Sequence, residues 1–209
     1  MTTRLAAPIA IRLPQRAASG AAAALLDCAS IGAHEQGVAC LARGLALAMG
    51  HGDGFADAVA TAGLLHDIGK SAVPDRILNH PGRLSEGDWA VLRRHTVYGH
   101  DMLATLGGEE LALAASVALH HHEGWDGSGY HGLRGAAIPL AARLVTICDV
   151  YDALREDRAY KAGMGHDEAC TVIAFGDARL DPRQFDPAVH AAFLAGADRL
   201  RAEYEALER

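Results

Sequence analysis

The sequence has few aromatic residues and no long uninterrupted apolar segment. Phenylalanine, tryptophan and tyrosine together make up 5% of the 209 residues, although half of all residues are hydrophobic. Sheets are rich in aromatic and β-branched residues, whereas alanine and leucine favour helices. The composition therefore predicts an all-α fold, a bundle of about seven to nine helices. No stretch approaches the roughly 20 apolar residues that span a bilayer, so we expect no membrane-spanning helix.

An excess of positive charge is also missing. The formal net charge is −7 at pH 7, whereas proteins that bind nucleic-acid polymers or anionic membranes present a basic surface. The charge therefore argues against both kinds of partner. It also means that any phosphate-bearing ligand has to be held by local cations or by metal ions.

Paired cysteines and a secretion signal are absent as well. The cysteines form no CxxC pair and lie far apart in the chain: Cys28, Cys40, Cys148 and Cys170. This spacing is typical of reduced thiols in a cytoplasmic protein. The first 20 residues contain scattered arginines and two prolines in place of the apolar core of a signal peptide. We expect a tail over residues 1–20 and one domain over residues 21–209, in the cytoplasm.

Apolar residues recur at helical spacing along most of the chain. Ser85 is a suitable N-cap for the helix that follows it, and Gly107 with Gly108 would end that helix. The predicted helices cover residues 21–30, 37–49, 53–67, 86–106, 109–122, 138–154 and 167–175, followed by a closing helix to the C-terminus.

The segment TAGLLHDIGK, residues 61–70, ends an apolar helical turn with His66 and Asp67. An imidazole and a carboxylate are both good ligands for a divalent metal. Adjacent helical residues point about 100° apart, so these two side chains could hold one ion, or a close pair, from two sides. Gly69 can adopt a positive φ and is expected to end the helix there.

Further histidines and acids interrupt apolar helices, and in a helical bundle such residues can converge on metals. Each also has a structural interpretation: His95 as a solvated histidine, His34 as a surface residue, Asp149 as a buried acid paired with Arg143. Three tandem histidines could be an exposed helix end. The candidate set comprises His34, His66, Asp67, His95, His121, His122 and Asp149.

Six blocks, taken in order, resemble the HD-GYP family of metal-dependent phosphodiesterases, which hydrolyse the bacterial second messenger cyclic di-GMP. The resemblance extends over residues 34–193. The blocks are TAGLLHDIGK, VPDRIL, RRHTVYGHDML, HHEGWDGSGYHGLRG, IPLAARLVTICDVYDALREDRAYK and QFDPAV.

The resemblance implies an HD-domain bundle with two divalent metal ions, in which Asp67 bridges the metals and a metal-activated hydroxide attacks phosphorus. Iron or manganese suits a shell of nitrogen and oxygen ligands without thiolate, and zinc remains open. His120 is expected not to be a ligand. The implied ligands are His34, His66, Asp67, His95, His121, His122 and Asp149; the catalytic residues are Asp67 and Lys70; the substrate-binding residues are Lys70, Tyr130, Asp152, Arg158 and Lys161.

Three positions depart from the family pattern. His131 replaces the proline of the Gly-Tyr-Pro motif, so the loop is expected to be more mobile. Ser30 stands where members with a third metal carry a glutamate, which favours two metals. Gly37 stands where an arginine is common. None of these changes removes a ligand of the metal pair.

The resemblance implies hydrolysis of cyclic di-GMP to pGpG, and leaves open whether hydrolysis continues to GMP. Two alternatives remain open: an HD-type phosphohydrolase acting on another nucleotide, and a catalytically idle module that binds cyclic di-GMP or a protein and relays a signal. Family members are often fused to a receiver or sensor domain, and about 20 leading residues are too few for one. Regulatory input is therefore expected from elsewhere, for example a separate protein, and the oligomeric state is left open.

Overall fold

The computed structural model describes residues 31–157 and 162–207. Within these ranges the regular structure consists of α-helices and short 3₁₀ helices, without strands, which confirms the predicted all-α fold. The helix expected over residues 21–30 and the tail expected over residues 1–20 lie outside the described residues. Among the described cysteines, Cys40, Cys148 and Cys170, there is no disulfide.

The helix boundaries follow the predicted periodicity closely. In the described residues the elements are α2 (Ala33–Ala48), α3 (Asp53–Leu65), η1 (Ile68–Ala72), α4 (Asp75–Leu78), α5 (Glu86–Arg93), α6 (His95–Leu106), α7 (Glu109–His120), η2 (Gly135–Ala137), α8 (Leu140–Arg155), α9 (His166–Phe175), η3 (Pro182–Gln184) and α10 (Pro187–Glu205). None of the helices in this part of the chain has the length and apolar character needed to cross a membrane.

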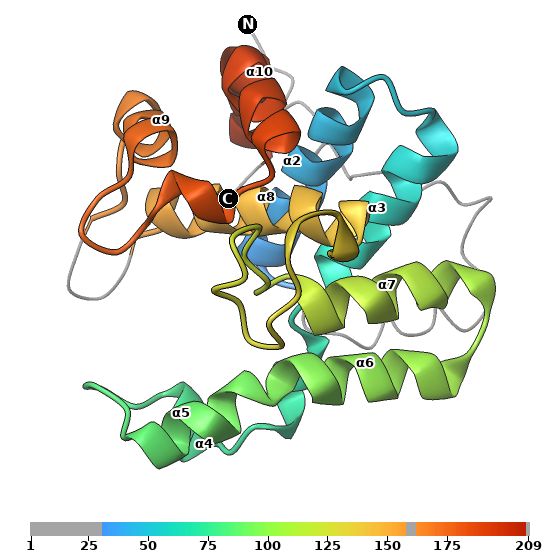
Figure 1. The fold of residues 1–209 in the computed structure, drawn as a ribbon, viewed down its shortest axis with the longest axis vertical. Helices are drawn as coiled ribbons and strands as arrows, with labels where there is room; N and C mark the ends of the chain where they lie inside the picture. The colour runs from blue at the N-terminus through green and yellow to red at the C-terminus, as the bar shows by residue number, and fades with distance from the viewer. Residues whose placement is uncertain (1–30, 158–161, 208–209) are drawn as a thin grey trace, which may run out of the picture.

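Helix α8 runs through the middle of the molecule, and other helices pack around it (Figure 1). Helices α6 and α7 form an antiparallel pair, and α3 connects this pair to α2. Helix α9 lies beside the C-terminal end of α8, and α10 packs mainly on α2. The shared core consists largely of buried alanine, leucine, valine and isoleucine side chains, as the low aromatic content requires.

Local capping sets the ends of several helices. The hydroxyl of Ser85 accepts a hydrogen bond from the Asp88 amide at 3.1 Å, so the predicted N-cap of α5 is confirmed. Gly107 and Gly108 have φ angles of 71° and 95°, which L side chains rarely adopt. These two glycines therefore end α6 and turn the chain into α7.

The prediction of a single helix over residues 86–106 is wrong in one respect. The helical segment is broken at Arg94 into α5 and α6. His95 Nδ1 donates to the Leu92 carbonyl at 2.7 Å, and the Thr96 hydroxyl donates to the Arg93 carbonyl at 3.0 Å. Side chains that bind nearby carbonyls compete with the main-chain bonds of a helix. His95 therefore begins α6 instead of lying in the middle of a longer helix.

The predicted role of Gly69 is also wrong. Gly69 is not among the glycines with positive φ, and α3 has already ended at Leu65. A Cβ atom at this position would lie 2.0 Å from the His95 carbonyl oxygen and 2.4 Å from the Gly99 nitrogen. The absence of a side chain at Gly69 is needed because η1 packs directly on the backbone of α6.

We predict that Gly69→Ala destabilises the protein by about 1 to 3 kcal/mol or more, because the added methyl group forces two backbones apart. Gly54→Ala is the matched control, since a Cβ at Gly54 in α3 meets nothing within 4 Å. Urea unfolding should give a lower midpoint for Gly69→Ala at unchanged slope, and an unchanged or slightly higher midpoint for Gly54→Ala. Equal midpoints for the two variants would contradict the packing argument.

Candidate metal centre

The seven candidate ligands converge on one place in the bundle. Their ligand atoms form two groups, in each of which the atoms lie within 4.8 Å of one another. They come from α2, the C-terminal end of α3, the start of α6, the end of α7 and the middle of α8. One group consists of Asp67, His95, His121 and His122, and the other of His34, His66 and Asp149.

The carboxylate of Asp67 lies between the two groups and faces both. Its Oδ1 atom lies 3.3 Å from His95 Nε2 and 3.7 Å from His121 Nε2. Its Oδ2 atom lies 3.3 Å from His66 Nε2 and 3.9 Å from His34 Nε2. Each carboxylate oxygen therefore points toward a different set of imidazoles, as a bridging ligand between two cations would.

Four of the candidate imidazoles are held in one orientation by a hydrogen bond from Nδ1, the ring nitrogen that does not face Asp67. The Nδ1 atoms of His66 and His95 donate to the carbonyls of Gly63 and Leu92, each at 2.7 Å. His121 Nδ1 lies 3.0 Å from the Ala118 carbonyl. This arrangement leaves the Nε2 lone pairs free to bind a metal, and such outer contacts are usual for metal-binding histidines.

The fourth of these histidines, His34, is oriented by a carboxylate. Its Nδ1 donates to Asp152 Oδ2 at 2.7 Å, and its Nε2 lies 3.3 Å from Asp149 Oδ1. Asp152 is fully buried behind His34. Its position differs from the predicted contact with substrate, since a buried side chain facing an imidazole orients that imidazole instead.

Three candidate ligands were also given a purely structural interpretation from the sequence, and the structure shows that each of these interpretations is wrong. His95 is 2% exposed and is therefore not a solvated histidine. Arg143 pairs with Asp186 instead of Asp149, and Asp149 faces His34 and His66. His34 is only partly exposed and faces the cluster instead of the surface.

The electrostatics of the cluster fit a cation. Burial alone would raise the pKa of Asp67, but His66, His121 and Lys70 outweigh it and hold that pKa well below its ordinary value. Burial lowers the pKa of His122, and neighbouring imidazoles lower it further, so this side chain is neutral. Asp67 Oδ1 and His66 Nε2 are buried without a hydrogen-bond partner. Such orphaned buried atoms are costly unless something binds them, and a divalent metal matches both donors.

The remaining predicted residues surround the cluster where the structure describes them. The Lys70 ammonium pairs with Asp67 Oδ2 and stays partly exposed. The ring of Tyr130 contacts the ring of His122, with centroids 4.7 Å apart and the ring planes tilted by 38°. Arg158 and Lys161 lie outside the described residues, as does Ser30, so their predicted roles stay predictions. His120 and His131 belong to neither ligand group.

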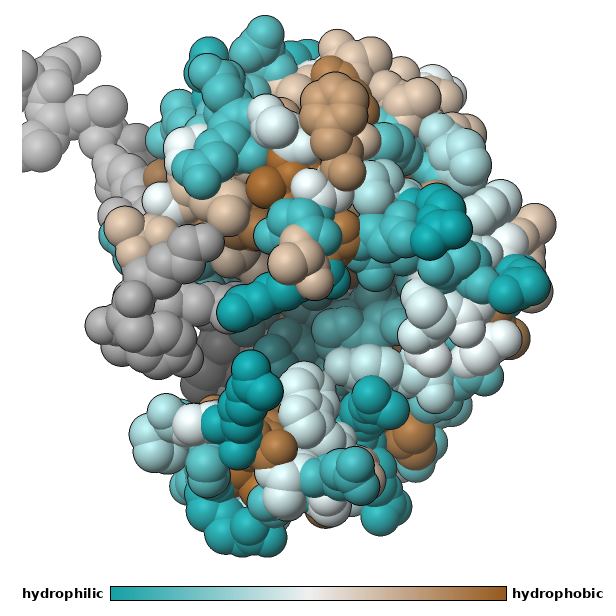
Figure 2. All heavy atoms as spheres, turned by 60° about the vertical axis from the view of Figure 1, so that its left-hand side comes forward, coloured by the Kyte–Doolittle hydropathy of each residue, from teal (hydrophilic) through white to brown (hydrophobic). Residues whose placement is uncertain are grey.

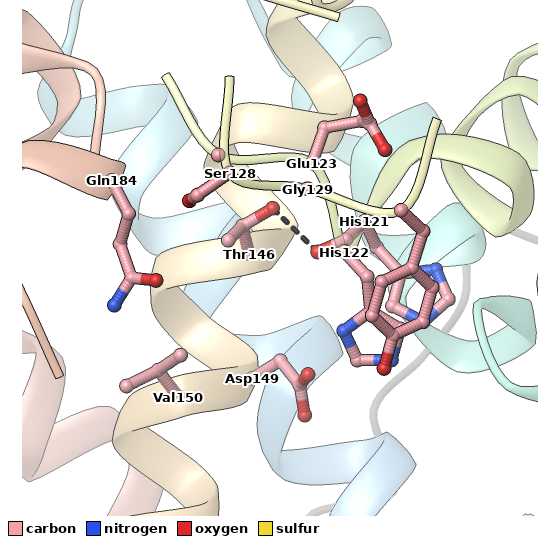
Figure 3. A pocket seen from close by; sticks show the side chains of 11 residues that line it. His121, His122, Glu123, Ser128, Gly129, Thr146, Asp149, Val150 and Gln184 are labelled. Atoms are coloured by element: carbon pink, nitrogen blue, oxygen red, sulfur yellow. Dashed lines mark hydrogen bonds between the residues drawn. The ribbon is translucent and has the colours of Figure 1, made fainter. Parts of the chain in front are cut away.

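A cavity of about 200 Å³ adjoins the cluster. Figure 3 shows His121, His122 and Asp149 on its inner side, with Ser128 and Gln184 across from them. Figure 2 shows that this face of the molecule is hollowed between an upper and a lower part, and that the floor of the hollow is hydrophilic. The lower part of that view holds α4 and α5, which lie at the bottom of Figure 1.

The loop that follows α7 is fixed by Glu123, a residue that the sequence analysis missed. Its side chain is 3% exposed and accepts hydrogen bonds from the amides of His131 at 2.7 Å and Leu133 at 2.6 Å. Gly129 allows the loop to fold back, because a Cβ there would lie 2.4 Å from the Glu123 Cα. The position directly after two candidate histidine ligands was the only sequence signal for Glu123.

The hydrogen bond from the His131 amide to Glu123 compensates for the absence of the family's proline at this position. Proline has no amide hydrogen, so only a residue such as His131 can donate to Glu123 from this position. The His131 ring also contacts Thr96, with Nε2 and the hydroxyl oxygen 3.2 Å apart. The structure therefore gives no support to the expectation of a more mobile loop.

An all-helical bundle that gathers buried histidines and aspartates from five segments around one carboxylate defines a divalent-metal-binding protein. The sequence model of the HD domain matches residues 12–184. The chain therefore belongs to the HD-domain family, in agreement with the resemblance found in its sequence.

Curated relatives with high similarity are bacterial phosphodiesterases. A cyclic di-GMP phosphodiesterase of Vibrio cholerae is 45% identical over 137 residues, which cover 63% of this chain and 27% of that protein. A cyclic di-GMP phosphodiesterase of Pseudomonas aeruginosa is 47% identical over 131 residues, covering 62% and 31%. A 3'3'-cGAMP-specific phosphodiesterase of Vibrio cholerae is 43% identical over 131 residues, covering 62% and 25%. The matched part of this chain thus spans less than a third of these relatives.

Two solved structures share the fold. An HDG"Y"P protein from Bdellovibrio bacteriovorus superposes with a TM-score of 0.60 at 22% identity, covering 80% of this chain and 51% of that one. The HD domain of the phosphodiesterase PgpH from L. monocytogenes, in complex with cyclic-di-AMP, gives a TM-score of 0.57 at 18% identity, covering 87% and 97%.

We predict that Glu123→Ala releases the loop after α7. Hydrogen bonds to a charged acceptor contribute about 1.5 to 3 kcal/mol each, so the variant should be less stable by at least that amount. In hydrogen-exchange experiments the His131 and Leu133 amides should lose protection, whereas amides in the middle of α8 keep theirs. The control is Glu168→Ala, which removes an exposed acid of α9. Unchanged protection at both loop amides would show that Glu123 does not fix the loop.

Proposed function

We propose that this chain is a metal-dependent phosphodiesterase that hydrolyses cyclic di-GMP to pGpG. The observation that carries the proposal is the Asp67 carboxylate, whose two oxygens face two separate groups of buried ligand atoms. The activities for which the curated relatives are named support the same substrate class.

The proposed metals are two divalent ions per chain, iron or manganese in preference to zinc. Imidazole and carboxylate donors without thiolate suit all three. When bound, such a pair would supply a nucleophilic hydroxide and neutralise charge on the phosphodiester. The proposed ligands are those of the two groups, with Asp67 shared between them.

The protein itself contributes orientation and charge. Gly63, Leu92 and Asp152 fix the imidazoles. Burial alone would lower the pKa of Lys70, but Asp67 more than offsets this and raises it. Lys70 therefore stays charged next to Asp67, where it can bind a phosphate oxygen of the substrate. Tyr130, whose ring contacts His122, forms a wall against which the substrate rests.

A second candidate substrate is 3'3'-cGAMP, because a relative named for that activity has almost the same identity as the cyclic di-GMP enzymes. The metal centre would act identically on both, so the difference depends on the residues that contact the bases. A catalytically idle signalling module is a weaker candidate, because its only support was the missing loop proline, and Glu123 holds the loop at that position. The expected cytoplasmic location and regulatory partner stay predictions.

We predict that the metal content of a variant depends on which of the two ligand groups has lost a side chain. Protein purified without oxygen and loaded with Fe(II) or Mn(II) should carry two equivalents by elemental analysis. Asp149→Ala removes a ligand of one group and should leave about one equivalent of metal per chain. Asp67→Ala removes the carboxylate that faces both groups and should lose both metal equivalents. The control is Asp101→Ala, an exposed acid of α6, with two equivalents expected. Two equivalents in Asp67→Ala would exclude the bridging role.

We predict that the metal-loaded protein hydrolyses cyclic di-GMP to pGpG; chromatography separates pGpG from GMP and so also shows whether hydrolysis continues. Asp67→Ala should reduce turnover roughly a thousandfold or more, because several kcal/mol of transition-state stabilisation depends on the metals. Addition of a chelator should abolish turnover, and Fe(II) or Mn(II) should restore it. A panel of cyclic di-GMP, 3'3'-cGAMP and cyclic di-AMP at equal enzyme concentration identifies the preferred substrate. A protein that holds two metals and cleaves none of the three would refute the proposed activity and favour the idle module.

A further inference from the structure

A row of side chains in ring and cation–π contact leads outward from the metal centre. The Tyr130 ring lies 4.7 Å from the His122 ring, and the guanidinium carbon of Arg93 lies 5.0 Å from the Tyr130 ring centre. The same carbon lies 6.0 Å from the Trp89 ring centre. Arg93 and Trp89 belong to α5, on the lower side of the hollow in Figure 2. One aromatic ring thus separates the Arg93 guanidinium from a candidate metal ligand.

Arg93 differs from most other arginines of the described chain in having no carboxylate within ion-pair distance. Arg43, Arg143 and Arg155, for example, each pair with an acid. Arg93 is exposed, and its only described contacts of this kind are the two aromatic rings. Burial raises the pKa of the Tyr130 hydroxyl, whereas the charge of Arg93 acts in the opposite direction, as expected for close neighbours.

A guanidinium held by cation–π contacts, with no carboxylate partner, keeps its N–H donors available. These donors match two oxygens of a phosphate, and a side chain already held in place loses less conformational freedom on binding. In a protein with a net charge of −7, an unpaired cation next to the metal centre is a specific attraction for an anion. A cyclic dinucleotide has two phosphodiester groups, and only one of them can occupy the metal centre at a time.

We propose that Arg93 binds the phosphodiester of a cyclic dinucleotide that is not being cleaved. The inference rests on the proposed phosphodiesterase function and adds a substrate contact outside the metal centre. Trp89 and Tyr130 hold the guanidinium in place, and Lys70 and the metals hold the other phosphodiester. Arg93 thus favours substrates with two phosphates over simple phosphodiesters.

The test compares KM and kcat for Arg93→Gln and the wild type with two substrates. For cyclic di-GMP, KM should rise roughly 10- to 100-fold, because a hydrogen-bonded charge is lost, while kcat stays within about threefold. For bis(p-nitrophenyl) phosphate, which has one phosphate, both constants should stay unchanged. Arg93→Lys, which keeps the charge without the planar fork, should give an intermediate KM.

Arg94→Gln is the matched control. Arg94 is the next residue, is also exposed and also stacks on a tyrosine, with its guanidinium carbon 4.9 Å from the Tyr98 ring centre. Tyr98 belongs neither to the ligand groups nor to the cavity lining. KM of Arg94→Gln should therefore equal that of the wild type, and an equal rise in both variants would reduce Arg93 to a general charge effect.

Three further outcomes would overturn the proposal. KM for cyclic di-GMP could stay unchanged in Arg93→Gln, both substrates could be affected equally, or the loss could be confined to guanine-containing dinucleotides and absent for cyclic di-AMP. The last result would mean that Arg93 contacts a base. Calorimetric titration of cyclic di-GMP into metal-free protein measures the same contact without hydrolysis. Binding that weakens in Arg93→Gln, in a protein without turnover, would reject the proposed activity and retain Arg93 as a phosphate contact.

Discussion

The structure depends on one buried carboxylate. Asp67 lies 8% exposed among four imidazoles, with each oxygen facing a different pair. A buried charge is strongly unfavourable unless it is paired or coordinates a metal. The neighbouring structure stabilises this charge. Lys70 supplies a cation, and helix carbonyl groups bind the Nδ1 atoms of the histidines so that their Nε2 atoms point toward Asp67. The helical scaffold therefore serves as a rigid holder that surrounds the Asp67 carboxylate with imidazole nitrogens and the Lys70 ammonium.

Bringing His95 to Asp67 requires two departures from regular helical structure. The break at Arg94 lets α6 begin at His95, and the side chains of His95 and Thr96 bind the carbonyls that the break leaves available. Gly69 allows η1 to lie directly against the His95 carbonyl. These irregular features lie within a few residues of the ligands, and both determine how closely α6 approaches Asp67.

Much of the fold could be predicted from sequence because alanine and leucine at helical spacing leave little alternative to a helical bundle. The ends of α5 and α6 were predictable where a cap residue or a glycine pair marks them. The break at Arg94 was not, because it depends on side-chain contacts of His95 and Thr96 that have no sequence signal of their own. The convergence of seven scattered residues came from the family resemblance, since periodicity cannot tell which helix ends meet. The burial of Asp152 behind His34, the packing of Gly69 and the hydrogen bonds of Glu123 depend on tertiary contacts and could not be read from sequence.

The loop after α7 shows how one family position can change without loss of order. A proline would restrict the backbone at position 131 but could not donate a hydrogen bond, whereas His131 donates one to Glu123. A second bond from Leu133 makes Glu123 a two-point anchor for the segment that carries Tyr130. Because Tyr130 contacts both His122 and Arg93, the anchor fixes the ring that connects the metal centre to the surface of the hollow. The order of this loop thus comes from a buried carboxylate instead of a rigid residue, and it depends on Glu123 accepting hydrogen bonds from both amides.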